Sequence, residues 1–175
     1  IAAASIAQVH FAKIKINNKE EELAIKILRP NIHTLVNDEL DALMFFAYLI
    51  ENIFHKTKRL KLVEVISLLK QITNIEMDLR FEAAAASELR ENTINDKGIK
   101  VPKIYWNYTS RKILTLDRIN GVSIRDIEKL KNLNIDLKSL SENLIQLFLK
   151  QSVRDGFFHA DMHQGNLFVD KFGNI

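Results

Sequence analysis

Apolar and polar side chains alternate along residues 6–17, which is the pattern of a strand with one buried face. Turn-forming asparagine and lysine residues follow at 17–19, and an apolar-rich segment at 23–28 is typical of a second strand. Pro30 is expected to end that strand, because proline cannot donate a backbone hydrogen bond to a neighbouring strand. The pattern therefore predicts a β-hairpin over residues 6–28.

After the hairpin, the apolar residues take helical spacing. They recur with the period of one helix face over residues 32–54 and again over residues 62–91, and a basic stretch at 55–59 separates the two segments. This pattern predicts two consecutive helices. Residues 104–119 then have the composition of two strands joined by a turn at 109–111.

A last long helix is predicted to end near Asp155. Asp136 or Ser139 could cap its first turn, and Gly156 is expected to terminate it. A hinge is expected near residues 116–121, where the strand pattern stops. The order of these elements predicts an α+β protein.

Composition narrows the class of protein. The hydrophobic content of 47% and charged content of 27% are those of an ordinary globular domain, and a net charge of +3 gives no electrostatic argument for nucleic acid. The absence of cysteine excludes a disulfide scaffold and a zinc–thiolate site. The longest apolar run, 42–50, is far shorter than the roughly 20 residues that cross a bilayer. No signal peptide is evident, so we expect a soluble piece of a longer protein.

The most informative polar residues lie near the end of the chain, between residues 156 and 169. An apolar helix leads into a loop that carries Asp161 and, five residues later, Asn166, and a short apolar strand follows. This spacing equals that of a protein-kinase catalytic loop, in which the Asp accepts the hydroxyl proton and the Asn binds Mg²⁺. His159 also matches that signature, whereas Ala160 replaces its Arg. Two alternatives stay open for the loop alone, because these residue types are common in turns and because two histidines with acidic neighbours could bind a metal.

Two charged residues earlier in the chain have kinase-like positions. Lys26 lies in the second predicted strand, where a kinase lysine holds the α- and β-phosphates, although a strand lysine usually faces solvent. Glu82 lies beside an alanine tract in a predicted helix, where a kinase carries the glutamate that pairs with this lysine. An exposed helical charge is the alternative for Glu82.

The first strand is preceded by four small residues, Ala2, Ala3, Ala4 and Ser5. A kinase has its Gly-rich phosphate loop at that point, but an ordinary strand edge would have the same composition.

Taken together, these residues resemble the UbiB family of atypical protein-kinase-like proteins, which are involved in ubiquinone (coenzyme Q) biosynthesis. The resemblance covers the chain from end to end in five ordered runs, at 2–10, 23–30, 78–85, 101–106 and 157–167. It implies a protein-kinase-like two-lobe α+β fold. A β-sheet N-lobe with an inserted helical hairpin would cover residues 1–119. A truncated helical C-lobe, with the catalytic loop at 159–166, would cover residues 120–175.

The resemblance also implies a role for each site residue. Asp161 would be the catalytic Asp and Asn166 the magnesium ligand, while Lys26 would bind the nucleotide and pair with Glu82. The remaining matches are the alanine-rich nucleotide loop and the family's Glu-x-Asp motif, which fall on Ala2, Ala3, Ala4, Ser5, Glu76 and Asp78.

This sequence departs from the family pattern in three places. Gln164 stands where the family often has Pro, the Lys-x-Gly-Gln segment would lie upstream of Ile1, and the Asp-Phe-Gly metal ligand would lie beyond Ile175. This chain alone is therefore not expected to be catalytically competent.

The resemblance implies an atypical kinase or ATPase that uses ATP or ADP with Mg²⁺ and supports ubiquinone biosynthesis. Its candidate partners are ubiquinone-biosynthesis proteins and lipid, without nucleic acid, at the cytoplasmic face of the inner membrane. The alternative is a non-catalytic, nucleotide-responsive scaffold for a membrane-associated lipid-modifying complex.

The kinase interpretation makes two geometric predictions. The Lys26 ammonium should lie within roughly 4 Å of the Glu82 carboxylate, the range of a salt bridge. Asp161 and Asn166 should face one cleft with Lys26, between a mixed sheet lobe and a helical lobe. Asp161 and Lys26 should lie within about 15 Å of each other, because both act on one triphosphate in kinases.

Overall fold

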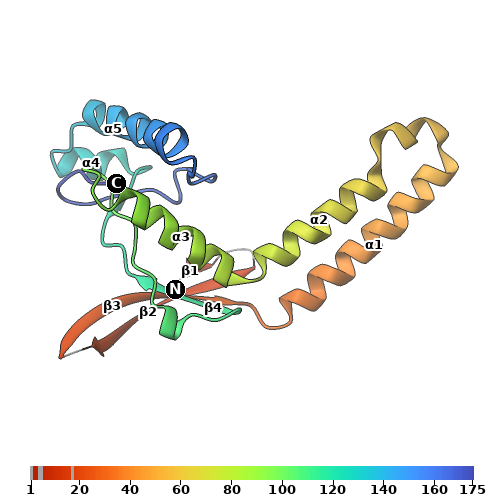
Figure 1. Ribbon diagram of the computed structural model, residues 1–175, viewed down its shortest axis with the longest axis horizontal. Helices are drawn as coiled ribbons and strands as arrows, with labels where there is room; N and C mark the ends of the chain where they lie inside the picture. Colours follow the sequence, from red (N-terminus) through yellow and green to blue (C-terminus); the bar gives the residue numbers. More distant parts are fainter. Residues whose placement is uncertain (1, 4–5, 17) are drawn as a thin grey trace. The chain divides into compact units, whose positions relative to one another are not determined.

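A hairpin of two long strands forms the centre of a four-stranded sheet. The computed structural model describes residues 2–3, 6–16 and 18–175 of the chain (Figure 1). The strands are β1 (Ala2–Ala3), β2 (Ala7–Ile16), β3 (Lys19–Leu28), β4 (Ile113–Asp117), β5 (Val122–Ser123) and β6 (Phe168–Val169). The larger sheet has the order β1-β2-β3-β4, and β5 and β6 pair as a small antiparallel sheet. The predicted hairpin over residues 6–28 is therefore confirmed.

The helices account for most of the rest of the described chain. The α-helices are α1 (Ile32–Ile53), α2 (Leu62–Glu76), α3 (Leu79–Thr93), α4 (Ile127–Asn132) and α5 (Leu137–Leu149). Two short 3₁₀ helices, η1 (His55–Leu60) and η2 (Trp106–Tyr108), and one π-helical turn, η3 (Lys150–Asp155), complete them. No helix in the described part of the chain combines the length and the apolar composition needed to cross a membrane.

The chain divides into two compact units that interleave in sequence. The first unit consists of Ile1–Phe11, Ile25–Ala83 and Trp106–Thr115, and the second consists of Ala12–Ala24, Ala84–Tyr105 and Leu116–Ile175. Each unit is described by itself below. The predicted division into lobes at residues 119 and 120 stays a prediction.

In the first unit, α1 and α2 pack side by side as a helical hairpin. An ion pair of 2.6 Å between Lys70 Nζ and Asp41 Oδ1 links the two helices, and the Val63 amide donates to Glu51 Oε1 near their connection. The basic stretch that was predicted to break the helices forms η1 between them. The inserted helical hairpin expected after the second strand is therefore present.

The prediction of one continuous helix over 62–91 is wrong, because the chain breaks at Met77 and Asp78. The Met77 amide ends α2 by donating to Thr73 O, and the Asp78 carboxylate then accepts the backbone N–H of Arg80 in the first turn of α3. Met77 is almost fully buried, with 1% of its surface exposed. An aspartate that caps a new helix thus overrides the helical propensity of the sequence around it.

The prediction of two strands over 104–119 is also wrong, because only β4 forms. Ile104 makes a single isolated bridge to Leu116, and the next residues form η2. Asp117 makes the other contacts here. Its backbone amide donates to Lys103 O, and its carboxylate accepts the Lys103 amide and the Tyr105 hydroxyl. The Lys103 amide, which a strand partner would have accepted, is therefore satisfied by a side chain.

The core of the second unit joins the short helices to the small sheet. Its buried members are Leu130, Leu140 and Val169, and partly buried apolar residues pack against them. Asp136 caps α5 by accepting the Lys138 and Ser139 amides, as one of the two predicted caps. The predicted helix end at Gly156 is confirmed, with φ of +64°, but the last turn is π-helical.

Candidate functional site

Lys26 and Glu82 form a close ion pair within the first unit. Lys26 Nζ donates to both carboxylate oxygens of Glu82, at 2.9 Å and 2.7 Å. The two residues are 56 positions apart in sequence and come from β3 and α3. The predicted contact is therefore confirmed. Lys26 lies between Ile25 and Ile27, and Leu23 and Ala24 of the same strand are buried. Its side chain is only partly exposed.

Asp78 fixes the start of the helix that carries Glu82. Its carboxylate is largely buried and accepts hydrogen bonds from the Arg80 guanidinium at 2.9 Å and 2.6 Å. Arg111 Nε lies 3.9 Å from the same carboxylate, and the Leu79 amide donates to Arg111 O. The Arg80 guanidinium lowers the pKa of Asp78 to about 2, so the carboxylate is ionised and holds α3 against the segment before β4.

The remaining residues of the predicted Glu-x-Asp motif and of the predicted alanine-rich loop have the following places in the structure. Glu76 is the last residue of α2 and its side chain is exposed. The backbones of Ala2 and Ala3 form β1, which pairs with β2 opposite Val9 and Gln8. The last two residues of the predicted alanine-rich loop, Ala4 and Ser5, lie outside the described residues.

In the second unit, the loop after η3 brings Asp161 and Asn166 together. Asn166 Nδ2 donates to the backbone oxygen of Asp161 at 3.0 Å and to its carboxylate Oδ2 at 2.9 Å. Two acceptors around one amide group identify that group as the NH₂ end, because the oxygen end would be repelled there. The amide oxygen of Asn166 therefore points away from Asp161, as a metal ligand on this residue requires.

Two histidines shape the same loop through their ring nitrogens. His159 Nδ1 accepts the Asp161 amide at 3.2 Å, and His163 Nδ1 accepts the Gly165 amide at 2.9 Å. In the neutral ring each proton then resides on Nε2, and His163 Nε2 lies 3.6 Å from Asp161 Oδ2. A metal site on these histidines, the alternative left open by the sequence, has no support: no group of three His, Asp or Glu side chains in the described ranges could hold a metal ion.

Gln151 is the residue of this region that the sequence did not identify as functional. It lies in η3 with only 2% of its surface exposed, and its Oε1 accepts the His159 amide at 3.2 Å. A signal was present, because Gln151 continues the apolar face of Leu140 and Leu147 at helical spacing. A polar side chain at a core position of that kind needs a partner.

The small sheet holds the far end of the loop. Ser123 Oγ donates to Gln164 O at 3.3 Å, and the Ile124 amide donates to Leu167 O at 3.1 Å. Gly121 lies beside this pairing, where an added Cβ would stand 2.9 Å from Val169 O. The loop is thus tied at its start to η3 and at its end to β5.

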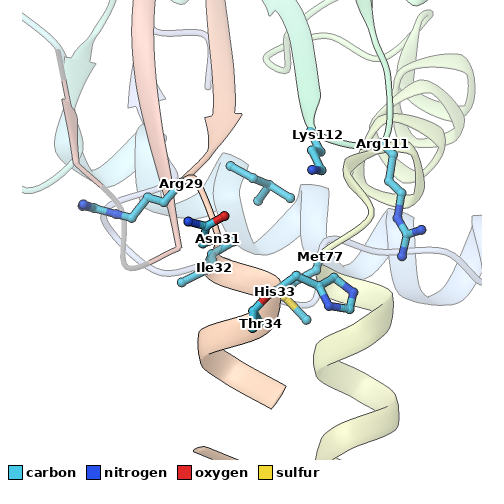
Figure 2. A pocket seen from close by; sticks show the side chains of 9 residues that line it. Arg29, Asn31, Ile32, His33, Thr34, Met77, Arg111 and Lys112 are labelled. Atoms are coloured by element: carbon cyan, nitrogen blue, oxygen red, sulfur yellow. The ribbon is translucent and has the colours of Figure 1, made fainter. Parts of the chain in front are cut away.

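A cavity of about 370 Å³ lies elsewhere in the first unit, where β3 leads into α1 (Figure 2). Its lining residues are Leu28, Arg29, Asn31, Ile32, His33, Thr34, Met77, Arg111 and Lys112. Neither Lys26 nor Glu82 lines it, so this cavity gives no support to the predicted nucleotide site.

The donor set fits a magnesium nucleotide in part. Mg²⁺ prefers oxygen ligands, and the Asn166 amide oxygen is one of this kind. The Lys26 ammonium is the kind of group that neutralises phosphate charge. These residues fall in two units, so the predicted cleft and the predicted separation of Asp161 from Lys26 stay predictions.

Comparison with known proteins identifies the family of this chain. The model of a family described as the ABC1 atypical kinase-like domain matches residues 1–175. The probable protein kinase UbiB of Histophilus somni is 41% identical over 171 residues, covering 97% of this chain and 31% of that protein. The protein of the same name from Pseudomonas paraeruginosa is 40% identical over 169 residues, with the same coverage. The chain thus spans about a third of the length of these curated relatives.

A solved structure gives the same fold. The Rv3197–erythromycin complex from Mycobacterium tuberculosis matches with a TM-score of 0.78 at 23% identity, over 99% of this chain and 42% of that one. The protein-kinase-like α+β fold expected from the sequence is therefore confirmed, and so is the resemblance to UbiB proteins. With the match to its family model running from the first residue to the last, this chain belongs to the ABC1 atypical kinase-like domain family.

Proposed function

We propose that the full-length protein is an atypical kinase or ATPase that transfers the γ-phosphoryl group of ATP and supports ubiquinone biosynthesis. The observation that carries the proposal is the bidentate ion pair of Lys26 with Glu82. A strand lysine and a helix glutamate that are far apart in sequence but paired in space are the arrangement that active protein kinases require.

Each residue has a separate task in the proposed reaction. Lys26, held by Glu82, neutralises phosphate charge, which lowers the barrier electrostatically. The oxygen of the attacking hydroxyl or water bonds to the γ-phosphorus, and Asp161 accepts the proton that this oxygen loses. The bond between the γ-phosphorus and the bridging oxygen breaks, and ADP leaves with that oxygen. Asn166 keeps the Asp161 side chain in place through its NH₂ group and offers its amide oxygen to a cation. Bound Mg²⁺ would supply neutralisation of the phosphate charge.

The setting of the reaction is proposed from the relatives. They carry the name UbiB, which connects them with ubiquinone biosynthesis. We therefore propose ATP or ADP and Mg²⁺ as ligands, and ubiquinone-biosynthesis proteins and lipid as partners. In the full-length protein the domain would act at the cytoplasmic face of the inner membrane.

A scaffold without turnover is the second candidate, and one observation favours it. Exposed apolar side chains gather on the α1–α2 hairpin, among them Phe46, Phe54 and Leu60, next to the basic residues Lys58 and Arg59 of η1. A surface of this composition fits contact with lipid or a partner protein and takes no part in chemistry. Nucleotide binding would then act only as a signal.

ATP hydrolysis by the full-length protein distinguishes the two candidates. Asp161→Asn keeps the size of the side chain and removes the base, and we expect it to lower kcat by roughly 100-fold or more, as general-base removal does. Asp38→Asn, on the exposed face of α1, is the matched control and should leave kcat unchanged. Equal rates for the wild-type protein and Asp161→Asn would overturn the enzymatic proposal and favour the scaffold.

A further inference from the structure

We propose that Gln151 is a positioning residue that holds the Asp161 loop in its reactive shape. The proposal rests on the proposed function for its consequence in catalysis, although the loop contacts themselves stand independently of it. Gln151 is one of four buried polar or charged residues in the described ranges, and it lies directly before the loop.

Gln151 binds the start of the loop with both its backbone and its side chain. Its backbone oxygen accepts the amides of Gly156 and Phe157, the latter at 3.2 Å. Its side-chain Oε1 accepts the amide of His159 at 3.2 Å. One buried residue therefore accepts three backbone N–H groups of the segment that leads to Asp161.

The π-helical turn explains how one residue can reach so far. An α-helical carbonyl accepts the amide four residues ahead, but the carbonyl of Gln151 accepts those of Gly156 and Phe157, five and six residues ahead. This wider turn replaces the regular end of α5 and lets the chain leave at Gly156 in the left-handed region. Isolated π-helical turns are rare and often occur at functional sites.

Further hydrogen bonds continue from Gln151 to the reactive residues. His159, whose amide is bound by Gln151, accepts the Asp161 amide on its Nδ1. The Asp161 carboxylate in turn accepts a hydrogen bond from the side-chain NH₂ group of Asn166, and the backbone amide of Asn166 donates to His163 O. The side chains of Asp161 and His163 are mostly exposed, so packing alone does not fix them. Their placement depends on this hydrogen-bonded series, and Gln151 is its buried end.

The chemistry of the side chain predicts which substitutions matter. Gln151→Met keeps the length and volume but removes the acceptor, and leaves the His159 amide without a partner. Leu147→Met, one turn earlier on the same buried face, is the matched control for a change of core packing, which is well tolerated.

The first measurement is hydrogen–deuterium exchange of backbone amides in the full-length protein, which needs no activity. We expect Gln151→Met to accelerate exchange in residues 156–162 by about 10-fold or more, the effect of losing one buried hydrogen bond. Exchange in α3 should not change. Leu147→Met should keep the wild-type rates. If Gln151→Met fails to fold, Gln151→Asn is used instead, because it withdraws the oxygen by one methylene, and the same acceleration is expected.

The second measurement separates kcat from nucleotide affinity in ATP hydrolysis. A positioning role predicts that Gln151→Met lowers kcat by at least about 10-fold, whereas the Kd of ADP changes by less than about 3-fold, because the loop acts on the reacting atoms. Unchanged exchange in residues 156–162 would overturn the inference, and so would faster exchange without any loss of kcat. A wild-type protein that hydrolyses no ATP would refute the proposed function alone, since exchange would still decide whether Gln151 orders the loop.

Discussion

Lys26 and Glu82 illustrate how a contact can matter for activity and contribute little to folding. About a quarter of the Lys26 side chain and half of the Glu82 side chain remain exposed. Water screens charges at such positions, and exposed ion pairs contribute roughly 0–1 kcal/mol to stability. Under the proposed function, the pair matters because it orients the ammonium group of Lys26.

This difference gives the first prediction. Glu82→Gln should change the free energy of unfolding by less than about 1 kcal/mol, as for other exposed pairs. ATP hydrolysis by the full-length protein should nevertheless fall by roughly 10-fold or more, because an electrostatic contact to the phosphates is no longer held in place. Denaturant unfolding and steady-state kinetics test the two halves. Glu88→Gln, exposed on the same helix, is the control and should alter neither quantity.

Asp78 gives a prediction of pH dependence. Hydrogen bonds from Arg80 lower its pKa in the folded protein to about 2, against an ordinary value of about 3.9 in an unfolded chain. Its contribution to stability is therefore present above pH 4 and is lost as the pH falls from about 4 to about 2. Asp78→Asn removes this titration. The free energy of unfolding of the variant should depend less steeply on pH between 2 and 4 than that of the wild-type protein, and identical slopes would contradict the assignment.

At the scale of single residues, the sequence predicted the contacts that follow a known spacing and missed those that depend on the local path of the chain. The pairing of Lys26 with Glu82 could be anticipated because both lie in elements with clear periodicity. For Gln151, the sequence indicates only that a polar side chain on an apolar helix face needs a partner. Which partner it finds depends on a π-helical turn that no periodicity specifies. The Arg111 contact with Asp78 likewise depends on how two distant segments meet.

At the scale of elements, alternation and helical spacing predicted the β-hairpin and the α1–α2 pair. Both errors occurred where side chains take over backbone hydrogen bonds. Asp78 starts a new helix inside an apparently continuous one, and the Asp117 carboxylate accepts the Lys103 amide, which a strand partner would otherwise have accepted. Whether a side chain accepts a backbone hydrogen bond in this way depends on which residues lie nearby in space, so secondary-structure propensity alone does not reveal it.

The pairing of β5 with β6 supports a prediction about Gly121. A Cβ at this position would stand 2.9 Å from Val169 O and 3.2 Å from Val169 C, and backbone atoms cannot move aside easily. Gly121→Ala should therefore destabilise the protein by about 1–3 kcal/mol, as overpacking does. It should also accelerate exchange of the Ile124 amide, which donates to Leu167 O.

Gly156→Ala is the comparison for this prediction. Nothing lies within 4 Å of the added Cβ there, and φ is +64°. Its effect should be limited to the backbone strain of about 1–2 kcal/mol that a left-handed alanine carries, without faster exchange at Ile124. Unchanged exchange of the Ile124 amide in Gly121→Ala would show that the close approach to Val169 does not constrain the small sheet.

At the scale of the whole molecule, the residues that the kinase interpretation assigns to one site fall in two separate units. The first unit supplies Lys26 and Glu82, and the second supplies Asp161 and Asn166. The matched UbiB relatives are about three times as long as this chain. The full-length protein is therefore the right material for every test of activity.

The central claim is that these residues act on one magnesium nucleotide, and a calorimetric titration of the full-length protein with ADP tests it most directly. A nucleotide carries several negative charges and Lys26 offsets one of them, so binding should be weak without Mg²⁺. We expect Mg²⁺ to tighten binding to the wild-type protein by at least about 10-fold, a coupling of about 1.4 kcal/mol. Asn166→Ala should lose most of this dependence, and Lys26→Ala should weaken binding with or without Mg²⁺. Equal ADP affinity in all three proteins, with no effect of Mg²⁺ in any of them, would contradict the account.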